Sequence, residues 1–305
     1  MSQAEHVSVL LEESVAALAI KPDGIYLDGT FGRGGHSLAI LNSLSSSGRL
    51  IAFDKDPQAE SSAEQFSDDP RFEFVPASFA DVSARVAKAE LDGILLDLGV
   101  SSPQLDNAER GFGFSDDGPL DMRMDTRVGI TAAEWLATAS EADIADVIKN
   151  YGEERFARRM ALAIVKARAK LPITRTKQLA TIVAEANPKW EPNKHPATRA
   201  FQAIRIFIND EDVELQQGLE AAFESLAIGG CLAVISFHSL EDRKVKHTFR
   251  SLCRPPALPR YIPIPEPLQA VSARPVGGVI RASEAELIRN PRSRSAVLRI
   301  IERLP

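Results

Sequence analysis

The sequence predicts an α/β fold in which a mostly parallel sheet is interrupted by an all-helical segment. Short apolar runs alternate with stretches of helical character in the first and last parts of the chain, whereas the middle has helical character only. Strands that are apolar along their whole length are typical of parallel sheets covered by helices on both faces. With 305 residues, 44% of them hydrophobic, the chain is long enough to bury a sizeable core.

Four predicted strands precede the helical segment, and three of them end on an aspartate. The strands are residues 25–28, 49–54, 72–76 and 93–97, separated by helical stretches at 37–44, 57–66 and 81–89. Asp28, Asp54 and Asp97 close the first, second and fourth strands. The carboxyl ends of parallel strands meet at one edge, where open α/β sheets bind their ligands. We therefore expect these carboxylates to surround a binding site.

The helical segment opens with a long loop. Residues 99–129 are rich in Gly, Ser, Asp and Pro, and a loop of this length inside a domain is usually functional. Thr131 can cap the first helix, because Glu134 follows three residues later. Further helices are predicted at residues 153–170, 176–186 and 198–208. We expect a helical insert at 107–206 that binds substrate, and a discontinuous domain made of 1–106 and 207–305.

The sheet pattern returns after the insert. A helix is predicted at residues 214–226, closed by Gly229 and Gly230, and a fifth buried strand follows at 231–236. The last strand is predicted at residues 296–301. The proline-rich stretch 255–267 indicates an extended loop.

Composition excludes several classes of protein. The first twenty residues lack the basic start and apolar run of an export signal, and no apolar run is long enough to cross a bilayer. Cys231 and Cys253 form no C-x-x-C pair, so neither a disulfide framework nor a zinc site is expected. No tight group of His, Asp and Glu indicates a metal site. We expect a cytoplasmic protein with no metal, no membrane contact and no obligate protein partner.

The net charge of −6 hides an uneven distribution. Residues 153–205 hold 12 Lys and Arg against 4 acidic residues, and residues 243–305 hold 13 against 4. An acidic body with two basic segments can present a basic face to phosphates. The alternative is that these segments are ordinary solvated helix faces, and charge alone does not decide between the two.

The first strand is followed by a glycine-rich turn, residues 28–36. Glycines there allow a tight turn and a close approach to a ligand, and Asp54 lies 19 residues after Gly35, near the spacing of a ribose-binding acid. Dinucleotides and S-adenosylmethionine both use this arrangement. The turn lacks the register of G-x-G-x-x-G and resembles the Asp-x-Gly-x-Gly opening of class I methyltransferases. Asp28 would then either accept a hydrogen bond from the methionine ammonium or position the loop.

Longer motifs extend this resemblance to nearly the whole chain. They are the glycine-rich turn and residues 92–106, 118–124, 151–156, 195–203, 236–243 and 290–295. Together they resemble the MraW family of bacterial ribosomal RNA methyltransferases. The resemblance implies a class I, Rossmann-like methyltransferase domain interrupted by a helical domain. It also implies methylation of the exocyclic N(4) amine of one cytidine in the decoding region of 16S ribosomal RNA, with S-adenosylmethionine as cofactor.

The resemblance also assigns the cofactor contacts. They are Gly34, Gly35, His36, Asp54, Phe79, Asp97 and Gln104. Without it, Phe79 would be read as a core residue and His36 as a capping or packing residue. The Asp/Asn-Pro-Pro-aromatic motif of many amino-methyltransferases is replaced here by residues 97–103, so the catalytic roles stay open.

Three residues are candidates for handling the reacting amine. Asp97, or a backbone carbonyl of residues 99–102, would accept a hydrogen bond from the amine. Ser236 and His238 would hold the base or remove the proton, although His238 is equally consistent with a turn histidine. The candidate phosphate contacts are Arg123, Arg199, Arg243, Arg292 and Arg294. The target cytosine must leave its stack to reach a buried cofactor.

Other functions compete with this interpretation. A small-molecule methyltransferase would use the helical insert as a lid, and the two basic segments argue against it. A ribosome-assembly factor would bind RNA without turnover, but the intact glycines and Asp54 favour retained cofactor binding. A DNA methyltransferase is a third alternative.

Overall fold

The computed structural model describes residues 8–190, 195–255 and 271–305. The chain forms two compact units, one of Met1–Gly99 with Val213–Pro305 and the other of Val100–Asp212. The boundaries therefore lie a few residues from those that the sequence suggested. The loop predicted at 255–267 falls almost entirely outside the described residues.

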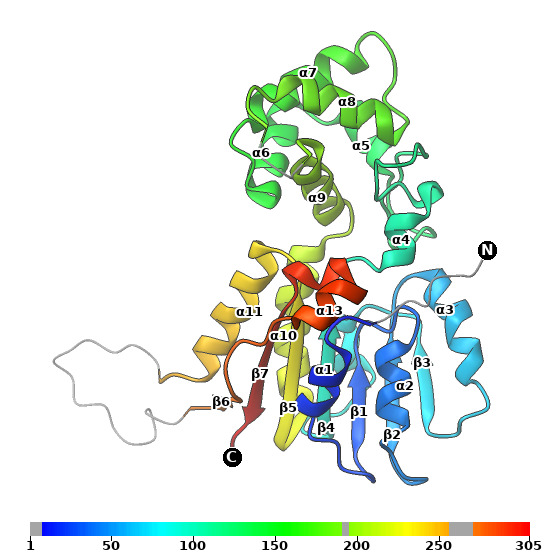
Figure 1. Ribbon diagram of the computed structural model, residues 1–305, viewed down its shortest axis with the longest axis vertical. Helices are drawn as coiled ribbons and strands as arrows, with labels where there is room; N and C mark the ends of the chain where they lie inside the picture. Colours follow the sequence, from blue (N-terminus) through cyan, green and yellow to red (C-terminus); the bar gives the residue numbers. More distant parts are fainter. Residues whose placement is uncertain (1–7, 191–194, 256–270) are drawn as a thin grey trace, which may run out of the picture. The chain divides into compact units, whose positions relative to one another are not determined.

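The first unit contains a seven-stranded sheet with the strand order β3-β2-β1-β4-β5-β7-β6 (Figure 1). The strands are β1 (Ile25–Asp28), β2 (Arg49–Phe53), β3 (Phe72–Val75), β4 (Leu91–Asp97), β5 (Leu226–Ser236), β6 (Ala273–Pro275) and β7 (Val297–Arg303). β1 to β5 are parallel, and β7 runs antiparallel to both of its neighbours. The predicted α/β fold is confirmed, and this strand order is that of a Rossmann-like class I methyltransferase.

Helices cover both faces of this sheet. The helices are α1 (Leu11–Ala17), α2 (Gly35–Leu41), α3 (Pro57–Ala63), α10 (Glu211–Ser225), α11 (Ser239–Leu252) and α13 (Glu284–Arg289), with 3-10 turns η1 (Glu64–Phe66), η2 (Phe79–Ala84) and η4 (Pro291–Ser295). Side chains alternate across a strand, so Leu95 packs with α1 and α2 while Ile94 and Leu96 pack with α10 and α11. Figure 1 shows α1 and α2 in front of the sheet and α10 behind it.

Several predicted elements of the first unit need correction. The helix predicted at 81–89 is the shorter 3-10 turn η2, and the fifth strand begins at Leu226, five residues earlier than predicted. Gly229 and Gly230 consequently lie within β5 and do not close α10. The point at which α10 ends and β5 begins depends on the hydrogen bonds that β5 forms with β4 and β7. The local sequence does not contain these partners.

The second unit is all helical, as predicted. Its helices are α4 (Ser102–Asp106), α5 (Ala132–Thr138), α6 (Glu141–Gly152), α7 (Ala157–Arg168), α8 (Thr176–Ala186) and α9 (Ala197–Ile208), with the 3-10 turn η3 (Ala108–Arg110). Thr131 and Glu134 form the predicted capping box. The single helix predicted at 153–170 begins only at Ala157, because Glu153 has a left-handed backbone (φ 51°) that ends α6.

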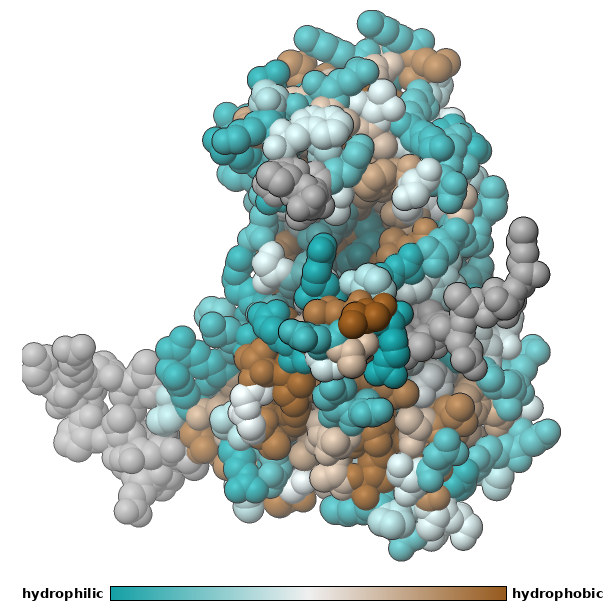
Figure 2. All heavy atoms as spheres, viewed as in Figure 1, coloured by the Kyte–Doolittle hydropathy of each residue, from teal (hydrophilic) through white to brown (hydrophobic). Residues whose placement is uncertain are grey.

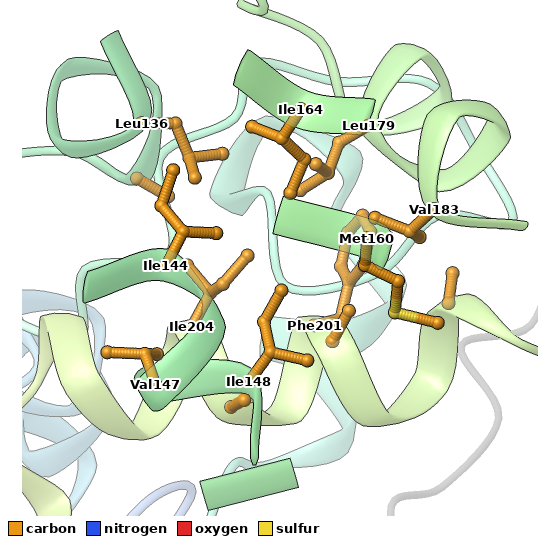
Figure 3. Packing of buried hydrophobic residues seen from close by; sticks show 14 of the residues in the cluster. Leu136, Ile144, Val147, Ile148, Met160, Ile164, Leu179, Val183, Phe201 and Ile204 are labelled. Carbon is orange, nitrogen blue, oxygen red and sulfur yellow. The ribbon is translucent and has the colours of Figure 1, made fainter. Parts of the chain in front are cut away.

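Aliphatic side chains from four helices form the core of the second unit. Figure 3 shows Ile144 and Ile148 of α6, Ile164 of α7, Leu179 of α8 and Ile204 of α9 pointing toward one another. Each of these side chains is fully buried. The core gives this unit a stable interior of its own.

Candidate active site

The glycine-rich turn after β1 requires glycine at particular positions. Gly32 (φ 56°) and Gly34 (φ 79°) have left-handed backbones, which side chains disfavour. A Cβ on Gly34 would lie 2.7 Å from the ring of Phe66, and one on Gly35 would overlap Ser8 Oγ. The Phe66 and Ser8 side chains thus pack directly on the backbone of this turn, which only glycine permits at these two positions.

Asp54 fastens this turn to the end of β2. Its Oδ2 accepts a hydrogen bond from Gly32 N at 2.8 Å, and its Oδ1 accepts one from Asp56 N at 2.9 Å. Burial raises the pKa of the Asp54 carboxyl to about 6, although both hydrogen bonds oppose the rise. A carboxylate has about four lone-pair positions, so Asp54 retains capacity to accept hydrogen bonds from two hydroxyl groups.

Asp28 accepts hydrogen bonds from residues of the turn and of the helix that follows it. Its side chain is fully buried, Oδ2 accepts a 2.7 Å hydrogen bond from Ser37 Oγ, and Oδ1 accepts one of 3.2 Å from Thr30 N. Burial raises the pKa of the Asp28 carboxyl, and the nearby His36 imidazole and these hydrogen bonds oppose the rise. Of the two roles expected for Asp28, these contacts favour positioning of the loop.

Asp97, at the end of β4, is placed differently. Its backbone N–H donates to Thr30 Oγ1 at 2.6 Å, which ties β4 to the turn. The side chain is 23% exposed, yet Oδ1 is buried and accepts no hydrogen bond from any described residue. Burial first, and then the negative charges of Asp28 and Glu241, raise the pKa of Asp97 well above its usual value. A buried polar atom without a partner is costly and indicates a functional position.

His36 lies between the N-terminal segment and Asp97. Its ring is 5% exposed, Nε2 is 3.1 Å from Val9 O, and Nδ1 is 3.8 Å from Asp97 Oδ2. Because a carbonyl oxygen can only accept, Nε2 carries a proton and donates it to Val9 O. Nδ1 is then the ring atom that faces the Asp97 carboxylate.

Ser236 and His238 follow β5 but have structural partners. Ser236 Oγ donates to Val297 O at 3.4 Å and its side chain is buried. His238 is the N-cap of α11: Nδ1 accepts from Glu241 N at 3.4 Å, and Nε2 lies 2.9 Å from Glu241 Oε1. Both ring nitrogens therefore bind the helix that His238 caps, which agrees with the turn-histidine reading.

Phe79 and Gln104 belong to different units. The Phe79 ring packs against α10, where a Cβ on Gly218 would overlap it, and its own Cβ lies 3.0 Å from the Cβ position of Gly29. Gln104 lies in the second unit, buried, and its Oε1 accepts a hydrogen bond from Ser101 N at 2.8 Å. Of the seven expected cofactor residues, six lie in the first unit, at or after the ends of β1, β2, β3 and β4: Gly34, Gly35, His36, Asp54, Phe79 and Asp97.

The arginines predicted to bind RNA fall into two groups. Arg123 forms a two-point ion pair with Asp121, and Arg199 lies 3.7 Å from Glu154, so both have internal partners in the second unit. Arg243, Arg292 and Arg294 are exposed on α11 and η4 of the first unit. Figure 2 shows hydrophilic atoms covering α11.

The sequence did not identify a pocket of about 220 Å³ in the second unit. It is lined by Glu154, Arg155, Phe156, Asn187, Lys189, His195, Pro196 and Arg199. The His195 ring packs on Phe114, with centroids 4.8 Å apart, and meets Trp190 edge-on at 5.6 Å. Cations beside aromatic rings suit a nucleotide. The lining residues come from the first turn of α9 and from the connections before α7, after α8 and before α9, which sequence spacing could not bring together.

Comparison with known proteins identifies the family of this chain. A family model described as the MraW methylase family matches residues 3–304. The chain belongs to the MraW methylase family. A member of a methylase family is a methyltransferase, and the enzyme class expected from the motifs is thereby confirmed for this MraW-family chain.

Two relatives of this MraW-family chain carry the name ribosomal RNA small subunit methyltransferase H. The protein from Thioalkalivibrio sulfidiphilus is 58% identical over 305 residues, covering 98% of this chain and 97% of its own. The protein from Alteromonas mediterranea is 55% identical over 306 residues, covering 98% of each. Among solved structures, an rRNA methylase from Streptococcus thermophilus is 12% identical with a TM-score of 0.40, covering 97% of this chain and 94% of that one.

Among the described residues, no helix is long and apolar enough to cross a membrane. No group of three or more His, Cys, Asp and Glu side chains in the described ranges is arranged to hold a metal ion.

Proposed function

We propose that this chain transfers the methyl group of S-adenosylmethionine to the exocyclic N(4) amine of one cytidine in 16S ribosomal RNA. Membership of the MraW family and the names of both relatives support methylation of small-subunit ribosomal RNA. The observation that carries the chemistry is the unpartnered Oδ1 of Asp97 beside the glycine turn. Small-subunit ribosomal RNA is the proposed substrate, and the cytoplasm is the proposed location, since ribosomal subunits are found there.

The residues at the sheet edge fit S-adenosylmethionine. Gly34 and Gly35 allow the turn to fold with Phe66 and Ser8 packed directly on its backbone, and Asp54 has lone pairs for the two ribose hydroxyls. The ring of Phe79 offers an apolar surface for the adenine, while Asp97 and Gln104 complete the proposed set. When bound, the cofactor supplies an electrophilic methyl group on a sulfonium sulfur. The task of the protein is then alignment of the amine with that methyl group.

Asp97 is the residue we assign to the reacting amine. The lone pair of a cytosine amine is delocalised into the ring, which makes the amine a weak nucleophile. A carboxylate that accepts a hydrogen bond from the amine N–H localises this lone pair and stabilises the positive charge that develops. The raised pKa of Asp97 also suits a group that receives the released proton. Ser236 and His238 remain weaker candidates for holding the base.

Two basic surfaces are proposed to bind the RNA. In the second unit, Arg155, Lys189 and Arg199 line the pocket beside the His195 ring, an arrangement that suits an unstacked nucleotide. In the first unit, Arg243, Arg292 and Arg294 are exposed and are proposed to contact phosphates. Arg123 is proposed to act chiefly by holding its loop through Asp121.

The test is methyl transfer from labelled S-adenosylmethionine to small ribosomal subunits from cells that lack this gene. We expect N(4)-methylcytidine at one position, identified by mass spectrometry of the digested RNA. Asp97→Asn should reduce the turnover number by about 100-fold or more, and Asp68→Ala, an exposed acid, serves as the matched control. Cofactor binding without any label in the subunit would overturn the ribosomal assignment and favour a small-molecule methyltransferase.

The non-catalytic alternative is separated by the same assay. An assembly factor would bind ribosomal subunits without turnover, and its binding would be unaffected by Asp97→Asn. An unmodified DNA oligonucleotide included beside the subunits tests the DNA alternative directly. Label in the DNA and not in the subunit would move the substrate assignment to DNA.

A further inference from the structure

The segment before α1 lies directly against the glycine turn. Val9 O accepts the hydrogen bond from His36 Nε2 at 3.1 Å, and Ser8 occupies the space above Gly35 that a Cβ would fill. Ser8 and Val9 are each 9% exposed. The position of residues 8–10 therefore determines both the orientation of the His36 ring and the packing over Gly35.

Leu10 sits in this segment with an unusual backbone. Its φ of 51° and ψ of 38° are left-handed, a conformation that is unfavourable for leucine. Leu10 is also the N-cap of α1, and its side chain provides no capping hydrogen bond. Its own N–H donates instead to Glu286 Oε1 at 2.8 Å, across 276 residues of sequence. This buried bond compensates for the strained conformation.

Glu286 is itself held in place by α13. Ser283 Oγ accepts a hydrogen bond from Glu286 N at 3.2 Å, and Glu286 O accepts one from Asn290 N at 2.6 Å. The side chain is 7% exposed, which is rare for a glutamate. The turn η4 follows and leads into β7, where Val297 pairs with Ser236 of β5. The carboxylate is thereby anchored to the central sheet.

We propose that Glu286 is a positioning residue for the cofactor site. It fixes Leu10 and so Val9, whose carbonyl accepts the hydrogen bond from His36 Nε2–H and leaves Nδ1 facing Asp97. The same contact holds Ser8 over Gly35. This inference rests on the proposed function, since it takes the glycine turn and Asp97 as the cofactor site. The C-terminal segment thus shapes the glycine turn and the surroundings of His36, which lie in the first hundred positions of the chain.

Four variants test the role of Glu286 by calorimetric titration with S-adenosylmethionine. Glu286→Ala and Glu286→Asp should each weaken binding about 10-fold, because the first lacks the acceptor and the second cannot reach Leu10 N. Glu286→Gln should stay within about 3-fold of the unmodified protein, because its amide oxygen accepts the same bond. Glu284→Ala, an exposed acid of the same helix, should leave affinity unchanged.

A spectroscopic measurement separates positioning from general stabilisation. The ¹⁵N resonances of His36, assigned with His36→Gln, should report the Nε2–H tautomer in the unmodified protein and in Glu286→Gln. Glu286→Ala and Glu286→Asp should show a mixture of tautomers. A folded Glu286→Ala protein that keeps both its cofactor affinity and the single tautomer would overturn the proposal.

Two outcomes need a further comparison. Should Glu286→Ala not fold, equal cofactor affinities of Glu286→Asp and Glu286→Gln would overturn the proposal, and the expected difference would support it. Should the unmodified protein not bind S-adenosylmethionine, the proposed function fails. The tautomer measurement needs no cofactor and would still decide whether Glu286 controls His36.

Discussion

Asp97 and His36 face each other at the carboxyl edge of the sheet, with 3.8 Å between Asp97 Oδ2 and His36 Nδ1. The other carboxylate oxygen, Oδ1, is buried and has no hydrogen-bond partner among the described residues. Asp28, by contrast, accepts a hydrogen bond at each of its two oxygens, from Ser37 and from Thr30. Two buried acids of one sheet edge therefore differ in role: one braces the loop, and the other keeps an oxygen for a ligand.

Asp97→Asn should stabilise the protein while it reduces activity. The pKa of Asp97 is raised in the folded state, so the folded protein binds more protons than the unfolded chain above pH 3.8, and stability falls as pH rises through the folded-state pKa. An asparagine cannot ionise, so the substitution removes the loss of stability that occurs when the Asp97 carboxyl ionises. We expect an increase of about 1 kcal/mol, or roughly 2–4 °C in Tm, at pH 8. Thermal melts from pH 5 to 8 should show the difference growing with pH, and a constant or reversed difference would contradict the reading.

Cofactor affinity should depend on pH through Asp54. Ribose hydroxyls donate to an ionised carboxylate, so binding lowers the pKa of Asp54 from about 6 and is favoured by its deprotonation. The dissociation constant should be flat above pH 7 and rise by up to about 10-fold per unit below pH 6. Calorimetric titration across this pH range measures the dissociation constant. Asp54→Ala should bind about 10–100-fold more weakly and lose the pH dependence, whereas a retained slope would assign it to another group.

Gly218→Ala should disturb the ring of Phe79. A Cβ at residue 218 would overlap the Phe79 ring, so either the ring or α10 must move. We expect a loss of about 1–3 kcal/mol in the free energy of unfolding, together with weaker cofactor binding. Gly278→Ala is the control, because a Cβ there meets nothing within 4 Å. Chemical denaturation and calorimetry measure the two effects, and unchanged cofactor affinity in a destabilised protein would remove Phe79 from the site.

Asn209 should be essential for the stability of the second unit. Its Oδ1 accepts from Met124 N at 2.6 Å and its Nδ2 donates to Met122 O at 2.7 Å, in a loop where Met122 has a left-handed backbone (φ 65°). Asn209→Ala leaves these buried backbone groups without their partner, at about 2–4 kcal/mol. Asn150→Ala, on the exposed side of α6, should change stability by less than about 0.5 kcal/mol. Equal urea midpoints for the two variants would show that the loop does not depend on Asn209.

Arg294→Ala should weaken binding to the small subunit in a salt-dependent manner. Arg294 is exposed on η4, and removal of one phosphate contact lowers the slope of log affinity against log salt by about 1. Arg49→Ala, at the start of β2 on the opposite edge of the sheet, should leave the slope unchanged. Filter binding at several salt concentrations measures both. Identical slopes for the two variants would place the RNA elsewhere.

The sequence by itself determined the succession of β1 to β5 and β7 along the chain, the helical insert and the aspartates at the strand ends, but it did not indicate α1, α11, α13 or β6. The features that it determined follow from local patterns: apolar runs of strand length, left-handed glycines in a tight turn, and a capping box such as that of Thr131 and Glu134. The same patterns did not reveal where β5 begins or that η2 is short. Both depend on hydrogen bonds and packing supplied by elements distant in the chain.

Only the tertiary structure decided how the site residues divide their work. The sequence left Asp28 with two possible roles, made Asp97 only one of several candidates for the reacting amine, and left His238 with two interpretations. Burial, neighbouring charge and available donors distinguish them, and those neighbours come from other strands and helices. The bond from Leu10 to Glu286 joins residues 276 positions apart, and a contact of that kind has no local signature because it is created by the folding of the sheet itself.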